Sequence, residues 1–365
     1  MSLNTEIQII NTPKKFSRLH LLAILLTVFG IGLFSYFVYS VGSGVILKGI
    51  AHIGFAGFVL ILFLYFLRIL ARAEAWKLCV YEPYKLNLRD TVGAVIIGEA
   101  LSSIIPLGIL ISGTAKAVAV RKKIPLVAGL SSVVTENLFY CFGTGIFIIF
   151  GAVAFLKTFQ LPAGWTIALS LLIGLVLLLI LFILVMIFRQ WRWVSAICEE
   201  LYERGFFKKI LENGRVQVRL FEDFIYGFYR LYPARFLPIL LLQITFHALG
   251  VAEVWFILNR ISAVASPGLY TSFLLESISR IIIIFFKLVP FLIGVDEAGA
   301  KFVTDALALG AGVGVTLAII RKGRILFWAA IGVILILKRG LSVRELFQQS
   351  EFTGQIAEEN KNVVS

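Results

Sequence analysis

Long apolar runs alternate with short polar segments along most of the chain. The apolar runs cover residues at about 20–41, 50–70, 125–155, 165–188, 236–258 and 311–337. A helix needs about 20 predominantly apolar residues to cross the hydrocarbon core of a bilayer. The pattern therefore predicts six membrane-spanning helices in a transmembrane domain at 20–340, preceded by a polar N-terminal segment at 1–19 and followed by a polar tail at 341–365.

Two further apolar stretches are interrupted by charged and helix-breaking residues. The first, at 91–111, contains Glu99 and Pro106, and basic segments lie at both of its ends. The second, at 270–309, contains Glu276, Arg280 and Pro290 before the glycine-rich run GVDEAGAK at 294–301. Because Lys and Arg collect on the cytoplasmic side, we expect the first stretch to enter and leave the membrane from that side. The same reasoning predicts that the second enters from the opposite side.

The two interrupted stretches and the apolar runs that follow them form similar units. A shift of 185 positions lays Lys116 on Lys301 and Glu136 on Arg321. The units, at about 91–156 and 270–338, are expected to cross the membrane in opposite directions. The predicted fold is therefore an all-α polytopic membrane helix bundle with inverted repeats and two re-entrant helical hairpins. Inverted repeats commonly place a substrate site near the bilayer midplane, where the two units meet.

The basic segments predict the orientation of the chain. Lys14, Lys15 and Arg18 precede the first run, and Lys338 and Arg339 follow the last one. Both termini are therefore expected in the cytoplasm. The segment 190–235 is also basic, and aromatic residues accompany its charges. It is either a solvated cytoplasmic connector or an amphipathic helix that rests on anionic headgroups.

Composition supports a membrane protein and argues against several other classes. Hydrophobic residues make up 59% of the chain, charged residues 15%, and the mean hydropathy is +0.95. Soluble domains contain about 25% charged residues. The net charge of +13 lies in short segments between apolar runs, which argues against nucleic-acid binding. The three Cys and three His are scattered without metal-ligand spacing, so we expect no metal, no cofactor and no disulfide framework.

Charged residues inside the apolar stretches are the candidate substrate-binding or cavity residues, because a charge at membrane depth is costly and commonly functional. Glu136 and Arg321 lie roughly 16 Å into their spans at 1.5 Å per residue, near the middle of a core about 30 Å thick. They either pair with each other as a structural link between the units or line a polar cavity that contacts a headgroup. The full set of candidates is Glu99, Lys116, Glu136, Glu276, Arg280, Asp296, Glu297, Lys301 and Arg321.

Lys116 and Lys301 each follow a glycine-rich break. Helix N-termini and Lys side chains at such a break suit a phosphate group. The alternative is that Lys116 reaches the cytoplasmic surface and Lys301 the external one. The sequence contains no P-loop or dinucleotide motif, and it brings no nucleophile, base and orienting group together, so we expect a protein that is not an enzyme.

The interrupted segments resemble those of the lysylphosphatidylglycerol synthase transmembrane-region family of flippase-like membrane proteins. The similar stretches are IIGEALSSIIPLGILISGTAKAVAVRKKIP with SSVVTENLFY, and VPFLIGVDEAGAKFVTDALALG with TLAIIRKGRILFW. With their helical spacing, the resemblance covers most of residues 15–340. It implies that positions near Glu136, Glu297 and Arg321 line a cavity, although the commoner acidic–basic pattern reads Glu136-Asn137 here.

The same resemblance implies a polytopic inner-membrane protein that moves or helps to handle lipids or lipid-linked sugars. In the best-known relatives this region flips aminoacylated phosphatidylglycerol and is fused to a cytoplasmic aminoacyl-transferase domain. This sequence ends about 25 residues after its last predicted span. We therefore expect the transferase domain to be absent and the activity not to be lysyl-lipid synthesis.

These observations predict a flippase or lipid transporter that moves a phospholipid or lipid-linked headgroup through a polar central cavity. The alternative is a membrane-embedded accessory protein or enzyme in glycolipid or polyprenyl-lipid synthesis. An ion channel is a third class, but the mixed sign of the candidate charges argues against it. The expected partners are anionic or lipid-linked membrane lipids in a bacterial inner membrane, and a homo-oligomer is left open.

Overall fold

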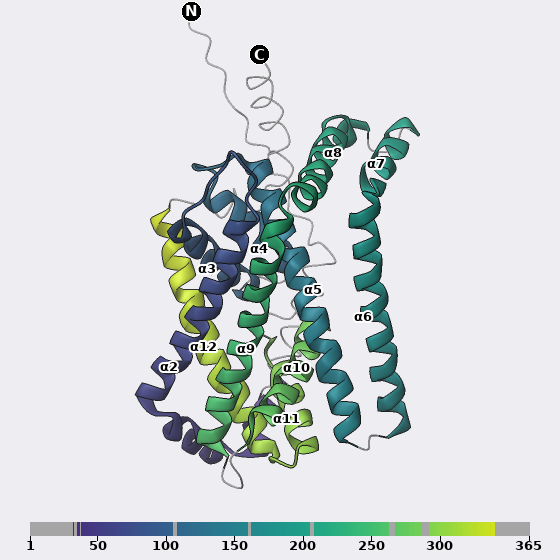
Figure 1. The fold of residues 1–365 in the computed structure, drawn as a ribbon. Helices are drawn as coiled ribbons and strands as arrows, with labels where there is room; N and C mark the ends of the chain where they lie inside the picture. Colours follow the sequence, from purple (N-terminus) through teal and green to yellow (C-terminus); the bar gives the residue numbers. More distant parts are fainter. Residues whose placement is uncertain are drawn as a thin grey trace, which may run out of the picture.

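The computed structural model describes residues 32, 35–36, 38–104, 108–159, 162–204, 208–262, 267–285 and 292–339. Within these ranges every regular element is helical, and the helices form one elongated bundle (Figure 1). The elements of the first half are α2 (Ser43–Leu78), α3 (Leu88–Ile104), α4 (Gly108–Ala119), α5 (Leu126–Thr158) and α6 (Ala163–Arg189). Those of the second half are α7 (Trp193–Glu203), α8 (Lys208–Leu231), a 3-10 turn (Pro233–Arg235), α9 (Phe236–Ile261), α10 (Leu269–Phe285), α11 (Val295–Ala306) and α12 (Ala311–Lys338).

Four helical segments among the described residues are long and apolar enough to cross a membrane. They are Ser43–Leu78, Leu126–Thr158, Thr166–Arg189 and Pro233–Ile261. α12 has 28 residues but carries Arg321, Lys322 and Arg324 near its middle. Most of the predicted first span at 20–41 lies outside the described residues. The prediction of an all-α polytopic helix bundle is confirmed.

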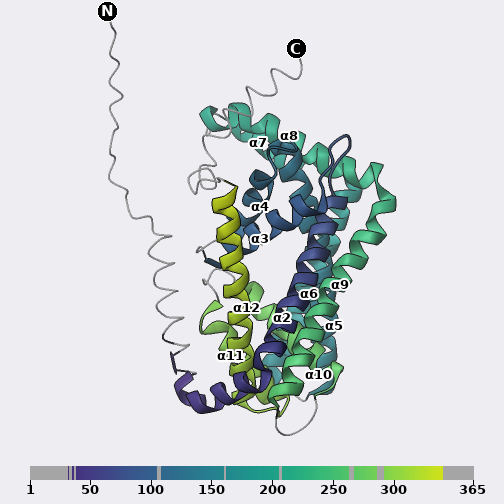
Figure 2. The ribbon, with the colours of Figure 1, turned by 90° about the vertical axis from the view of Figure 1, so that its left-hand side faces the viewer.

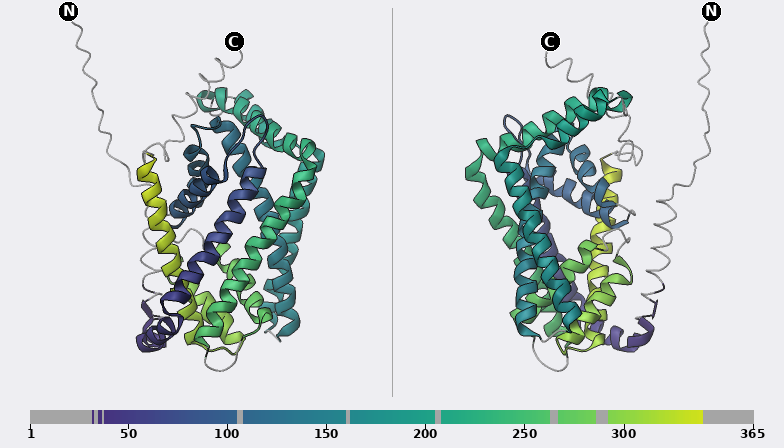
Figure 3. Two further views of the ribbon diagram at one scale, coloured as in Figure 1. Left: turned by 60° about the vertical axis from the view of Figure 1, so that its left-hand side comes forward. Right: turned by 90° about the vertical axis from the view of Figure 1, so that its right-hand side faces the viewer.

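The two interrupted stretches form two helical hairpins that lie in opposite halves of the bundle. Figures 1 and 3 show α3 and α4 in the upper half, and α10 and α11 in the lower half. α4 and α11 have 12 residues each, which at 1.5 Å per residue gives about 18 Å, against about 30 Å for a hydrocarbon core. Pro106 and Pro290, at which the sequence predicts the breaks, lie outside the described residues.

The packing of the two halves is reciprocal. The order long helix, hairpin, long helix occurs once as α2, α3, α4, α5 and again as α9, α10, α11, α12. α2 packs against α9, the hairpin helix α3 packs against α12 of the second series, and α10 packs against α5 of the first. Each hairpin is therefore held between its own series and the closing helix of the other.

One apolar core contains buried residues from both series of helices, α2–α5 and α9–α12. Ile61 of α2, Phe155 of α5, Ile257 of α9, Leu274 of α10 and Leu317 of α12 are all buried in one cluster. Burial of a side chain of this size contributes about 1.5–3 kcal/mol when the reference is water. In a membrane, close packing replaces much of that driving force, so small residues at helix contacts become important.

Gly332 illustrates such a contact and carries the first prediction. A Cβ atom at Gly332 would collide with Ala100 Cβ and lie 2.9 Å from the carbonyl oxygen of Ile96, so α12 and α3 touch at their backbones. Gly332→Val should force the helices apart and destabilise the protein by about 1–3 kcal/mol. Gly174→Val in α6 is the matched control, because nothing lies within 4 Å of its Cβ position. Equal midpoints of thermal unfolding in detergent for the two variants would contradict this assignment.

The structure corrects the predicted end of the second span. The sequence predicts that the helix ends near Leu70 and that Arg68 and Arg72 belong to the cytoplasmic segment after it. α2 instead continues to Leu78, and Arg68 is buried while Arg72 is mostly buried. The reason is that carboxylates from distant helices neutralise both guanidinium groups inside the bundle, as described below.

The predicted connector at 190–235 forms the helices α7 and α8 at one end of the bundle (Figure 2). Two of its aromatic residues pack against protein. Phe224 meets the ring of Tyr81 edge-on at 5.4 Å, and Phe228 meets that of Phe139 at 6.3 Å. These two residues therefore attach the connector to α5 and to the loop after α2. Phe206 and Phe207 lie outside the described residues.

Candidate functional site

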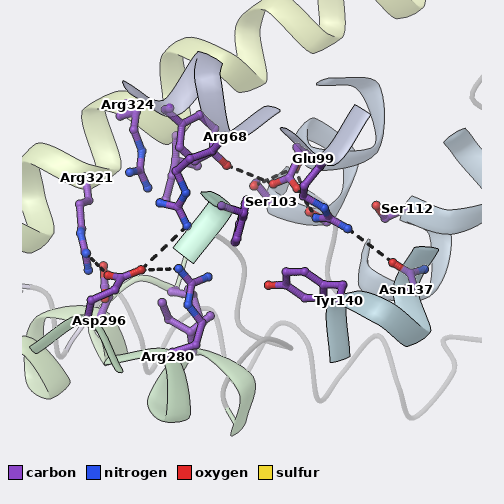
Figure 4. A pocket seen from close by; sticks show the side chains of 18 of the residues that line it. Arg68, Glu99, Ser103, Ser112, Asn137, Tyr140, Arg280, Asp296, Arg321 and Arg324 are labelled. Atoms are coloured by element: carbon purple, nitrogen blue, oxygen red, sulfur yellow. Dashed lines mark hydrogen bonds and ion pairs between the residues drawn. The ribbon is translucent and has the colours of Figure 1, made fainter. Parts of the chain in front are cut away.

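A polar cavity lies where α2, α9 and the two hairpins meet. Its volume is about 390 Å³. It is lined by residues of α2, α3, α4, α5, α9, α10 and α12, by Leu292 before α11, and by Asp296 in the first turn of α11. Cavities that hold small molecules have volumes of about 300–1,000 Å³. Figure 4 shows that basic side chains gather at one end, whereas hydroxyl and amide side chains gather at the other.

Glu276 is the centre of the basic end. From α10 its carboxylate pairs with Arg280, one turn further along the same helix, and with Arg321 of α12. Nη2 of Arg68 on α2 lies 3.9 Å from the same carboxylate. The Glu276 side chain is 2% exposed, so it depends on these cations for compensation, because an unpaired buried charge is strongly unfavourable.

Glu253 of α9 is a second buried carboxylate at this end. It pairs with Arg324 of α12 and, through Nη1 at 3.4 Å, with Arg68 of α2. Arg68 therefore stands between Glu253 and Glu276 and links α2, α9 and α10. Glu253 was not among the residues predicted from the sequence, although it is a lone acidic residue in a predicted span.

The opposite end is built around Arg72, one helical turn after Arg68. Its Nη1 lies 2.8 Å from Glu99 of α3, and its Nε and Nη2 each lie 3.3 Å from the Glu136 carboxylate of α5. Nζ of Lys116 on α4 is 3.7 Å from the same Glu136. A Cβ at Gly98 would lie 2.9 Å from Cγ of Lys116, so glycine at that position lets the Lys116 side chain pass across α3 to reach Glu136.

Polar side chains without charge complete this end. Oγ of Ser102 and Oγ of Ser103 each donate a hydrogen bond to the Glu99 backbone oxygen at 2.9 Å. Oδ1 of Asn137 lies 3.5 Å from Nη2 of Arg72. All three residues and Ser112 line the cavity. The end near Arg72 therefore presents neutral hydrogen-bonding groups beside compensated charges.

Aromatic rings separate the two ends. The guanidinium carbons of Arg68, Arg280 and Arg72 lie 4.3, 5.8 and 6.0 Å from the centre of the Phe246 ring. Tyr65 lies against Arg324, whose guanidinium carbon is 4.2 Å from the ring centre, while the Tyr65 hydroxyl donates to Glu99 at 3.2 Å. Cations over ring faces are stabilised most when they are shielded from water, so these rings help to hold the arginines inside the bundle.

The nine predicted residues fall into three groups. Those that line the cavity are Glu99, Lys116, Glu276, Arg280, Asp296 and Arg321. Glu136 lies directly behind the lining, buried against Arg72 and Lys116. Two predicted residues lie elsewhere: Glu297 accepts a hydrogen bond from the Gly294 backbone N–H at 2.8 Å and pairs with Lys322, and Lys301 pairs with Asp305 at 2.8 Å in a partly exposed position.

Two alternatives from the sequence are wrong. Glu136 does not pair with Arg321, because Glu136 binds Arg72 and Lys116 whereas Arg321 binds Glu276. Lys116 does not extend to the surface, because its side chain is 3% exposed. Arg68, Arg72 and Glu253 were not among the residues predicted from the sequence. Lys322 and Arg324 are close neighbours of the predicted Arg321, but they were not predicted as cavity residues either.

The charges of the cluster nearly balance, but four buried guanidinium donors have no acceptor in the part of the chain that the structure describes. The charged residues that line the cavity, together with their ion-pair partners, comprise seven basic side chains and six carboxylates. The basic residues are Arg68, Arg72, Lys116, Arg280, Arg321, Lys322 and Arg324, and the acidic residues are Glu99, Glu136, Glu253, Glu276, Asp296 and Glu297. Among the described residues, the buried Nε atoms of Arg68, Arg280, Arg321 and Arg324 find no acceptor. Buried donors normally have partners, so the basic end is suited to an anion with several acceptor oxygens.

The described residues contain no group of three or more His, Cys, Asp or Glu side chains placed to hold a metal ion. Arginine does not lose its proton in proteins, so it does not serve as a metal ligand or general base here. The chemistry that the cavity offers is recognition of an anion by fixed guanidinium groups.

Comparison with known proteins agrees with this picture of a membrane bundle. The family model described as the lysylphosphatidylglycerol synthase transmembrane region matches residues 21–337. That match spans both helical series and all of the cavity residues named above. No curated protein and no solved structure gives a significant match. The chain is therefore an integral membrane protein that belongs to the lysylphosphatidylglycerol synthase transmembrane-region family.

Proposed function

We propose that this protein is a lipid flippase or lipid transporter, which moves a phospholipid or lipid-linked headgroup through the central cavity while the acyl chains stay in the bilayer. The observation that carries the proposal is the cluster of largely buried arginines that lines a cavity built from both hairpins. Charges at membrane depth are retained mainly where they serve a substrate or ion pathway.

The proposed topology has two inverted units with re-entrant hairpins. The reciprocal packing of α3 on α12 and of α10 on α5 supports it. Arg68 and Glu253 also support it, because they are 185 positions apart, the offset that relates the two units, and they form an ion pair. Positions related by a two-fold axis touch each other only where the axis passes between them. We place that axis, and the substrate site, between α2 and α9.

The proposed orientation follows from the basic segments. The C-terminal ends of α2 and α12 lie in the upper part of Figure 1, as does the connector α7–α8. Lys77, Arg189, Arg192 and Lys338 lie in or beside these elements, and cytoplasmic loops are rich in such residues. We therefore propose that this end is cytoplasmic in a bacterial inner membrane, with the α3–α4 hairpin entering from it.

A reconstitution assay tests the proposed function. The purified protein in phosphatidylcholine vesicles should make an anionic phospholipid that is labelled on its acyl chain accessible to an external quencher, beyond the half that is accessible in protein-free vesicles. Vesicles that contain protein denatured before reconstitution provide the control for leakage. An identical quenched fraction in all three preparations would contradict transport.

Cys141 provides a second prediction, because this cavity-lining residue carries a thiol that is not in a disulfide. An anionic methanethiosulfonate reagent, drawn to the arginines, should attach to Cys141 and block most of the lipid movement. Cys141→Ser should make transport resistant, whereas Cys198→Ser in α7 should leave it sensitive. Cys79 is buried and should not react. Block of the Cys141→Ser variant to the same extent would show that the thiol does not lie on the lipid path.

A further inference from the structure

The two ends of the cavity offer different chemistry to one bound headgroup. Figure 4 shows Arg280, Arg321 and Arg324 at one end and Ser103, Ser112 and Asn137 at the other. The first end is built by α10, α11 and α12, and the second by α3, α4 and α5. Arg68 and Arg72, one turn apart on α2, belong to different ends. A headgroup that fills the cavity therefore contacts both sets of residues.

The basic end selects a phosphate group. Four guanidinium groups surround Glu253 and Glu276 there, and each of the four has a buried Nε–H without an acceptor among the described residues. A phosphate has several acceptor oxygens in tetrahedral geometry, and arginine binds such oxygens through directed, charge-assisted hydrogen bonds.

The opposite end selects groups that donate hydrogen bonds. The hydroxyl hydrogens of Ser102 and Ser103 are directed to the Glu99 backbone oxygen, which leaves the lone pairs of both Oγ atoms as acceptors. The Asn137 amide is oriented by Arg72, so its nitrogen side remains a donor. Mixed donors and acceptors at this spacing match alcohol hydroxyls, each of which donates one hydrogen bond and accepts others.

An ammonium group fits this end poorly, although it also donates hydrogen bonds. Glu99 and Glu136 are compensated by Arg72 and Lys116. Among the described residues of the cluster, basic groups outnumber carboxylates by one, so these residues hold no surplus negative charge to compensate a second cation. A buried, uncompensated charge is strongly unfavourable.

We infer that the headgroup is a phosphate ester of a neutral polyol, such as a glycerol, inositol or sugar phosphate, with the phosphate at Arg280, Arg321 and Arg324 and the hydroxyls at Ser102, Ser103 and Asn137. This inference rests on the proposed lipid transport, because it names the substrate class of the same cavity. It excludes headgroups that carry an amine from the set of good substrates.

A comparison of anionic phospholipids tests the inference. Phosphatidylcholine vesicles that contain the protein would receive trace amounts of phosphatidylglycerol, phosphatidylinositol, phosphatidylserine or phosphatidic acid, each labelled on an acyl chain. The first two carry a neutral polyol, whereas phosphatidylserine carries an ammonium group and a carboxylate at the same net charge. We expect the two polyol lipids to move about tenfold faster than phosphatidylserine, because one or two hydrogen bonds supply a factor of about this size. Equal rates for phosphatidylserine would overturn the inference and leave transport intact.

Paired variants assign the hydroxyl site. A Ser102→Ala/Ser103→Ala double variant should slow the movement of phosphatidylglycerol about three- to tenfold. It should not slow the movement of phosphatidic acid, which lacks a polyol. Ser131→Ala is the control, because Ser131 also donates to a backbone oxygen of its own helix but is not a lining residue of the cavity. Equal slowing of both lipids by the double variant would contradict the proposed contact between the serines and the polyol.

A binding experiment separates this inference from the transport proposal. Thermal unfolding in detergent would be followed with glycerol phosphate and with phosphoserine, which have similar net charge. Glycerol phosphate should raise the midpoint, and phosphoserine should need at least about tenfold higher concentration for the same shift. If no lipid crosses the membrane but this preference holds, the proposed transport fails and the headgroup assignment stands. If phosphoserine stabilises equally, the assignment fails whatever the transport result.

Discussion

Replacing Glu276 by Gln is expected to destabilise the folded protein more than any other single change at the cavity. Glu276 pairs with Arg280 and Arg321 and lies 3.9 Å from Arg68, and its side chain is 2% exposed. Gln keeps the size of the side chain but removes its charge, which leaves three guanidinium groups close together. Removal of one partner from a buried ion pair costs about 3–5 kcal/mol. The measurement is chemical unfolding of the purified protein in mixed detergent–lipid micelles.

Glu74→Gln is the matched control for that experiment. Glu74 is also a Glu that pairs with a basic residue. Its partner Lys77 is only three residues away, however, and both side chains are about a third exposed. Exposed pairs contribute about 0–1 kcal/mol. Adding Arg321→Gln to Glu276→Gln should recover part of the loss, because one uncompensated cation is removed. Equal effects of Glu276→Gln and Glu74→Gln would contradict the central role of Glu276.

The sequence predicted the helices well because a bilayer restricts the choice of structure. Backbone groups in hydrocarbon must be paired within the chain, so a long apolar run is a helix with few alternatives. The interrupted stretches were also predicted as hairpins, since Gly and Pro disfavour a continuous helix and basic residues lie at both ends of the first. In the described residues, each stretch contains two short helices, α3 with α4 and α10 with α11.

The charge cluster was predicted only in part, because charges were assigned to sides of the membrane by position along the chain. That method treats the first Arg after an apolar run as the end of the span. Arg68 and Arg72 break the rule because their carboxylates come from other helices, and Glu253 is 185 residues from Arg68. Such long-range compensation leaves no local pattern in a single sequence. A search for lone acids in other spans would have found Glu253 as a candidate partner.

The equivalent positions Glu136 and Arg321 show a second limit. The sequence offset relates them as corresponding residues of the two proposed units, yet correspondence does not imply contact. Each finds its partners near its own hairpin, Glu136 with Lys116 and Arg72, and Arg321 with Glu276. The two proposed units consequently hold opposite charges at equivalent positions. This difference makes one end of the cavity basic, whereas at the other end the positive and negative charges balance.

Arg280→Gln is expected to have the largest effect on transport with a small effect on folding. Arg280 lines the cavity, and its buried Nε has no acceptor among the described residues. Glu276 keeps Arg321 and Arg68 when Arg280 is neutralised, so its charge stays compensated. A hydrogen bond to a charged group contributes about 1.5–3 kcal/mol, and every 1.4 kcal/mol corresponds to about a tenfold change in affinity. Movement of labelled phosphatidylglycerol should therefore fall about 10- to 100-fold at limiting lipid concentration.

Two further variants separate charge from geometry at this position. Arg280→Lys retains the cation but not the fixed planar donors, so it should recover only part of the activity. Arg204→Gln removes an arginine whose pair with Glu200 is exposed, and it should transport at the wild-type rate. The three variants should unfold at similar temperatures in detergent. If Arg280→Gln is folded and moves lipid as fast as Arg204→Gln, the basic end of the cavity does not bind the transported headgroup. Arg280 is the position to test because, among the described residues, the other arginines of this end are partners of Glu253 or Glu276 from another helix.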